Sequence, residues 1–97
     1  AADITNRKIY FAKNGTYINS GNPAGAANGY TIPTTSESFY IFSASIFGAS
    51  GSWGANFGSP SFAISSGNAD GDGYGNFEYA VPSGYFSLNT KNLAEYG

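Results

Sequence analysis

The chain contains no cysteine and no histidine, and these two absences exclude much of the chemistry that proteins use. Without cysteine there is no disulfide, no nucleophilic thiolate and no zinc–cysteine site, and the redox compartment is left open. Without histidine the chain lacks the commonest general base, the serine–histidine triad and the usual imidazole metal ligand. We therefore expect a protein that is not an enzyme.

Charged residues are also scarce, with four basic and six acidic residues and a net charge of −2. No basic stripe is present to neutralise phosphates, so nucleic acid is not an expected partner. No run of 18 or more apolar residues occurs, so the sequence predicts no membrane span. A glycan-degrading enzyme is the weakest hypothesis, because no spacing places two of the available carboxylates in one cleft: Glu37, Asp70, Asp72, Glu78 and Glu95.

Aromatic residues and glycine are abundant instead. Aromatic residues make up 18% of the chain and glycine occurs 14 times, while the usual helix formers are few. This composition favours an all-β protein with many turns, and 97 residues suit a single domain, residues 1–97. The pair Asn14-Gly15 predicts a type I′ turn that joins strands over residues 7–13 and 16–19 into a hairpin.

The strongest strand prediction covers residues 37–48, because both of its faces carry apolar side chains, as in a strand inside a sandwich. Further extended segments are expected at residues 53–58, 77–81 and 84–90. Strand periodicity assigns six side chains to the core: Phe39, Ile41, Phe42, Ile46, Phe57 and Phe62.

Two other segments are not expected to be strands. Residues 20–35 are rich in glycine, asparagine, proline and alanine and predict a long loop, a kind of segment that often carries function. Residues 90–96 predict one helical turn with Thr90 as its cap, too short to be stable alone.

The segment NADGDG, residues 68–73, resembles the first half of a calcium-binding loop. Side-chain oxygens of Asn68, Asp70 and Asp72 fall at alternate positions, and a glycine stands sixth. The twelfth position is Tyr79 where a bidentate glutamate is needed, so calcium would bind weakly. The alternative interpretation is a turn in which the Asp and Asn side chains bond their own backbone.

Tyr30, Trp53 and Tyr74 lie near predicted turns and are candidate partner-binding residues, since exposed aromatic side chains form platforms for sugars or proteins. They also suit a simpler role, which is to cover the ends of a sandwich. If these aromatics converge with Asp70 and Asp72, the chain is a carbohydrate- or receptor-binding module, with the weak calcium loop at its centre.

Three segments resemble SPRY domains in the correct order: KIYFAKNGTYINSGNPA (8–24), WGANFGSPSF (53–62) and NADGDGYGNFEYAVPSGYFSLNTKNLAEYG (68–97). The first is similar to a hairpin of the C-terminal half of these domains. The last is similar to the closing segment of SPRY-like modules in structural proteins of tailed phages. The resemblance implies an all-β, antiparallel β-sandwich of the jelly-roll or concanavalin-like kind.

The strands of the N-terminal half of a SPRY domain have no counterpart in this chain. Since the sequence opens inside a predicted strand, we expect an incomplete SPRY-like domain whose apolar surface other polypeptide covers. The resemblance implies binding without catalysis, in a virion or extracellular protein of a phage tail fibre, adhesin or capsid surface. The implied partners are other virion chains or the missing N-terminal part of the same polypeptide, a host surface glycan or receptor, and copies of this chain in a homo-oligomer.

Overall fold

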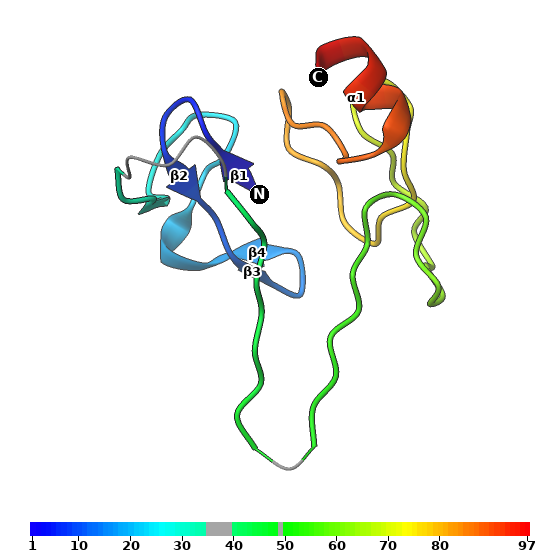
Figure 1. Ribbon diagram of the computed structural model, residues 1–97, viewed down its shortest axis with the longest axis horizontal. Helices are drawn as coiled ribbons and strands as arrows, with labels where there is room; N and C mark the ends of the chain where they lie inside the picture. Colours follow the sequence, from blue (N-terminus) through cyan, green and yellow to red (C-terminus); the bar gives the residue numbers. More distant parts are fainter. Residues whose placement is uncertain (35–39, 49) are drawn as a thin grey trace.

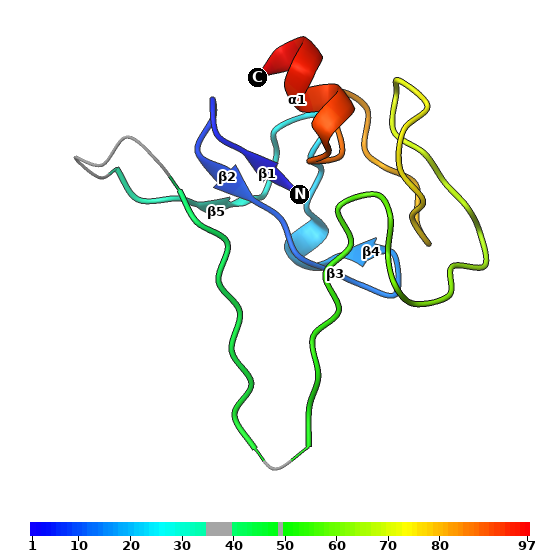
Figure 2. The same cartoon turned by 45° about the vertical axis from the view of Figure 1, so that its right-hand side comes forward.

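The computed structural model describes residues 1–34, 40–48 and 50–97. Within these ranges the fold is rich in short antiparallel strands and has one short α-helix. In Figure 1 the N-terminal third of the chain lies on one side and the C-terminal third on the other. Between them in sequence, a long excursion extends away from both, as Figure 2 shows from a second direction.

Among the described residues, five strands of two residues each form two small sheets. The first sheet has the strand order β1–β2–β5 and the second pairs β3 with β4, all antiparallel. Backbone hydrogen bonds beyond the strands extend the first sheet, since Tyr10 and Ala1 bond each other through N–H and C=O groups. The strands are β1 (Ala2–Asp3), β2 (Lys8–Ile9), β3 (Ala12–Lys13), β4 (Thr16–Tyr17) and β5 (Tyr30–Thr31).

The predicted Asn14-Gly15 turn is confirmed. Asn14 has φ of 50° and Gly15 has φ of 78°, so both central residues are left-handed, as a type I′ turn requires. The turn sets the register of β3 and β4, in which Ala12 pairs with Tyr17. The predicted flanking strands are shorter than expected, because the chain leaves β4 directly into a 3₁₀ turn, η1 (Ile18–Ser20).

The predicted loop over residues 20–35 contains a strand that the sequence did not indicate. Within it, β5 pairs with β2, with Tyr30 opposite Ile9 and Thr31 opposite Lys8. Composition alone predicts a loop here because glycine, asparagine and proline surround the two strand residues. The pairing depends on β2, which lies about twenty residues earlier in the chain.

The strand predictions after residue 36 are wrong where the structure describes them. Of the predicted strand 37–48, residues 37–39 lie outside the described residues, and residues 40–48 form no strand. The same holds for residues 53–58 and 84–90, and for residues 77–81 apart from a single bridge between Phe77 and Asn68. A strand requires a neighbour that accepts and donates its backbone hydrogen bonds. Apart from the bridge between Asn68 and Phe77, no strand pairing joins these segments to any described residue.

The predicted core is wrong for the same reason. Phe39 lies outside the described residues, while Ile41 and Phe42 are 80% and 78% exposed. In the described part of the chain, Tyr10 is the only large hydrophobic side chain that is buried, packed edge-on against Tyr17. The remaining members of the predicted core are also exposed: Ile46, Phe57 and Phe62.

The predicted helical turn is confirmed as α1 (Thr90–Tyr96), but its cap is Asn89 and not Thr90. The side-chain carbonyl of Asn89 accepts hydrogen bonds from the backbone N–H of Lys91 at 3.0 Å and of Asn92 at 2.9 Å. This satisfies two of the free donors at the helix start. In the part of the chain that the structure describes, no helix is long and apolar enough to cross a membrane.

Candidate functional site

A large open groove of about 810 Å³ lies between the N-terminal strands and the C-terminal third of the chain. One wall comes from the first 17 residues, including Ile4 of the β1–β2 turn and Tyr17 of β4. The other wall comes from residues 56–88, which contribute most of the aromatic rings. The groove is thus built by segments that are far apart in sequence, and its floor and walls are mostly apolar.

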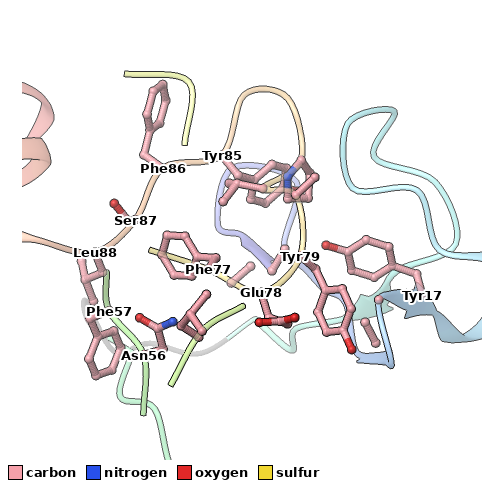
Figure 3. Close-up of a pocket in the computed structure, with 18 of the residues that line it drawn as sticks. Tyr17, Asn56, Phe57, Phe77, Glu78, Tyr79, Tyr85, Phe86, Ser87 and Leu88 are labelled. Carbon is pink, nitrogen blue, oxygen red and sulfur yellow. The ribbon is translucent and has the colours of Figure 1, made fainter. Parts of the chain in front are cut away.

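Figure 3 shows how the side chains are distributed along this groove. Tyr17 and Tyr79 lie at one end, from opposite walls, while Phe57 and Leu88 lie at the other end. Several of these rings are about half exposed, including Phe57 at 51% and Tyr79 at 53%. Side chains of this size are usually buried by the packing of a second sheet, so the groove has the character of an uncovered core.

Two polar side chains of the groove, those of Glu78 and Tyr85, form hydrogen bonds with other parts of the chain. The carboxylate of Glu78 accepts hydrogen bonds from the Ser65 backbone and hydroxyl and from the Ser66 hydroxyl, and the Ser65 hydroxyl is the main cause that lowers its pKa. The phenol of Tyr85 donates to the carbonyl of Pro23 at 3.4 Å, and burial is the first cause that raises its pKa to about 12.

Asp70 is the centre of the second feature, a buried polar cluster in the C-terminal third. One carboxylate oxygen accepts from the backbone N–H of Asp72 at 3.1 Å and of Tyr74 at 2.9 Å. The other accepts from the Ser87 N–H at 2.9 Å, the Ser87 hydroxyl at 2.6 Å and the Asn92 amide at 2.8 Å. The Ser87 hydroxyl is the largest cause that holds the pKa of Asp70 far below its usual range.

This geometry matches the alternative interpretation of residues 68–73, a turn in which the side chains form hydrogen bonds with the backbone. Asn68 uses its side-chain amide to donate to the carbonyls of Phe77 and Glu78, and Asp70 already accepts five hydrogen bonds. Among residues 1–34, 40–48 and 50–97, no three acidic side chains gather as a metal would require. Calcium binding at Asn68, Asp70 and Asp72 stays a prediction, and the ion would have to displace these donors.

The three aromatic candidates do not line the groove and stand on three different parts of the chain. Tyr30 lies in β5 and packs on Phe11, with ring centroids 5.8 Å apart. Trp53 lies on the long excursion and is 66% exposed. Tyr74 follows the acidic turn, where the ammonium of Lys91 sits 4.9 Å from its ring centroid. The carbohydrate hypothesis, which needs these side chains to converge, gains no support from their placement.

Sequence reasoning missed the groove, although a signal for it was present. Phe77, Tyr79 and Val81 are apolar residues at alternate positions, and all three line the groove, although the residues between them line it as well. Alternate apolar positions indicate a face that will be covered, but the opposite wall comes from the first 17 residues, which no spacing along the chain connects to it. A scan against protein-family models and searches of curated proteins and of solved structures found no match to this chain.

Proposed function

We propose that this chain is a non-enzymatic structural component of a tailed-phage virion, built on an incomplete SPRY-like β-sandwich of the concanavalin kind. Its apolar groove is the surface on which other virion polypeptide, or a preceding part of the same polypeptide, completes the sandwich. The component belongs to a tail fibre, an adhesin or the capsid surface, where host attachment is a further role. It acts through assembly, in the extracellular particle.

One observation carries the proposal. In the described residues Tyr10 is the only large hydrophobic side chain that is buried, while seventeen others are exposed. Burying apolar surface is worth roughly 25 cal/mol per Å², so a chain that leaves this much surface in water gives up most of its folding free energy. Covering the groove with other polypeptide restores that free energy, which couples folding of this chain to assembly.

The virion part of the proposal is supported by the three sequence segments that resemble SPRY-like phage modules. The absence of histidine and cysteine and the engaged carboxylates of Asp70 and Glu78 support a binding role without catalysis.

The test compares the isolated chain with the purified phage particle. Mass spectrometry of the particle is expected to find peptides of this chain at a constant ratio to the major virion proteins. Hydroxyl-radical footprinting is expected to modify Phe57 and Tyr79 readily in the isolated chain and weakly in the particle, with Tyr10 protected in both. An isolated chain that is monomeric, cooperatively folded and protected at Phe57 and Tyr79 would overturn the proposal.

A further inference from the structure

The segment that leaves the molecule furthest is a long arm, defined here as residues 40–48 and 50–55. Figures 1 and 2 both show it, in green, extending away from the rest of the chain. Its residues form no backbone hydrogen bond with any other described residue. Phe42 is 78% exposed and Phe47 wholly exposed. The arm therefore carries both free backbone groups and free apolar side chains.

We propose that the arm of one copy of this chain inserts into the groove of a second copy, so that two chains exchange arms in a closed, two-fold symmetric dimer. The inference rests on the proposed function, because it names what covers the groove. Ala2 of β1, Ala12 of β3 and Tyr17 of β4 line the groove, and all three strands are at the edges of their sheets. An extended segment inserted beside such an edge can join it by β-strand addition, in which backbone hydrogen bonds supply affinity and alternate side chains supply register. A reciprocal exchange buries both arms and leaves no third site open.

The arm has one face that suits the groove better than the other. Tyr40, Phe42, Ala44 and Ile46 share one side of an extended chain. The opposite side, called the serine face here, also carries apolar side chains, but two of its four residues are serines: Ile41, Ser43, Ser45 and Phe47. The first face bears no polar group except the phenol of Tyr40. We therefore assign that face to the groove and the serine face to the rim of the interface.

Charge complementarity also favours a second copy. No charged residue occurs between Glu37 and Asp70, so the arm is neutral over its whole length. In the groove Glu78 is the one charged side chain among the described lining residues, and Ser65 and Ser66 already bond its carboxylate. A basic partner would find only this one carboxylate, already bonded by Ser65 and Ser66, and an acidic partner would find no cationic side chain among the described lining residues. A partner with several charged groups would therefore lose hydration in this groove, whereas the neutral arm loses none.

The area matches what a stable dimer needs. Each copy contributes one arm face and both walls of its groove, which together expose nine large hydrophobic side chains by 42% to 78% each. Large side chains bury up to roughly 150–250 Å² each, so the exchange would cover on the order of 800 Å² per copy. Specific protein–protein interfaces bury about 800 Å² per partner. A neutral, two-sided apolar arm and a groove of equal character are thus sufficient for a standard interface.

The absence of cysteine makes a cross-linking test clean. Full-length chains carrying Ala44→Cys are mixed with isotopically heavy chains carrying Ala80→Cys, which places one thiol on the assigned arm face and one in the groove. A short bismaleimide is expected to join light to heavy chains. The matched control, Ala94→Cys on the exposed side of α1, is expected to give little cross-linking with Ala44→Cys.

Two arm variants test the assigned face. Phe42→Ser is expected to weaken the dimer by roughly tenfold or more in sedimentation velocity, as loss of a buried aromatic anchor does, and Phe47→Ser on the opposite face to weaken it less. Equal effects of the two variants would overturn the assigned face.

The same experiments separate failure of the inference from failure of the proposed function. If the chain is oligomeric or particle-bound but Ala44→Cys and Ala80→Cys never join across chains, arm exchange is wrong and assembly by other contacts stands. If a double variant carrying both cysteines cross-links only within one monomeric chain, the arm closes its own groove. In that case both the exchange and the need for other polypeptide are refuted.

Discussion

The N-terminal and C-terminal regions of the chain are each stabilised by a different kind of interaction. Residues 1–34 are joined by backbone pairing, in which β2 lies between β1 and β5 and a type I′ turn closes β3 on β4. Residues 68–97 have a single backbone bridge and one short helix, and they are organised by side chains around Asp70. Backbone pairing needs only neighbouring strands, whereas a side-chain cluster depends on each of its members. The C-terminal region should therefore be the one that a single substitution disrupts.

Removing the Asp70 carboxylate should have the largest effect. Asp70→Ala leaves the buried Ser87 hydroxyl without its acceptor and removes one of the three acceptors of the Asn92 amide, which keeps the carbonyl and hydroxyl oxygens of Ser87. An unsatisfied hydroxyl out of contact with water destabilises the fold. We expect the melting temperature to fall by about 10 °C. Hydrogen-exchange mass spectrometry should show protection lost over residues 68–97 and largely kept over residues 1–34.

The control for this variant is Asp72→Ala, because Asp72 is exposed and belongs to the same turn. It should change protection little in either region. Equal loss of protection at both ends in Asp70→Ala would mean that the two regions fold as one unit, and the comparison drawn above would then be wrong.

Acid should also separate the two regions. The pKa of Asp70 is held below its unfolded value of 3.8, mainly by the Ser87 hydroxyl, so this carboxyl contributes stability that is present above pH 3.8. That contribution is lost as the pH falls below 3.8 toward the folded value. Backbone NMR signals of residues 68–97 should change first on acidification. In Asp70→Asn the NMR signals of residues 68–97 should change less with pH over this range. A pH dependence as steep as that of the parent chain would show that Asp70 is not the group responsible.

A smaller effect is expected where the two ends meet. Gly15 has φ of +78°, and a Cβ at this position would lie 2.6 Å from a ring carbon of Tyr79. Gly15→Ala should cost about 1–2 kcal/mol in unfolding free energy, from backbone strain and from the clash together. In a Tyr79→Ala background the cost should fall to the strain alone. Denaturant titration of the four chains measures this cycle, and a cost that is independent of Tyr79 would show that the contact is not maintained.

The smallest effect should come from the helix cap. Asn89→Ala removes the acceptor for the N–H groups of Lys91 and Asn92 and should destabilise the C-terminal region by about 1 kcal/mol. The Asn89 amide nitrogen also donates to the Ser87 hydroxyl oxygen, and Asn89→Ser loses this bond as Asn89→Ala does, while its hydroxyl oxygen still caps the helix. Asn89→Ser should therefore lose less than Asn89→Ala, and the difference between the two isolates the cap. Thr90→Ala is the matched test of the cap expected from sequence, and a larger effect there than at Asn89 would contradict the observed cap.

Local features of the fold were predictable, and features that depend on distant partners were not. The turn at Asn14-Gly15 and the helix over residues 90–96 follow from the chemistry of a few adjacent residues. The strand β5 was missed because its pairing depends on β2, and the arm was assigned to a sandwich interior because both of its faces are apolar. Apolar faces predict that a segment will be covered, but not which polypeptide covers it.

The candidate site divides in the same way. The motif at residues 68–73 predicted one of two roles for Asp70, a cation ligand or the acceptor in a hydrogen-bonded turn. The contacts of its carboxylate with Ser87 and Asn92 arise only in the folded chain. Likewise, the apolar residues Phe77, Tyr79 and Val81 can be recognised in the sequence, but the groove exists because residues from the start of the chain form the opposite wall. The sequence by itself determines turns and helix starts, because these depend on interactions between residues a few positions apart. Only the tertiary structure determines a groove or a buried cluster, because these form where segments distant in sequence come into contact.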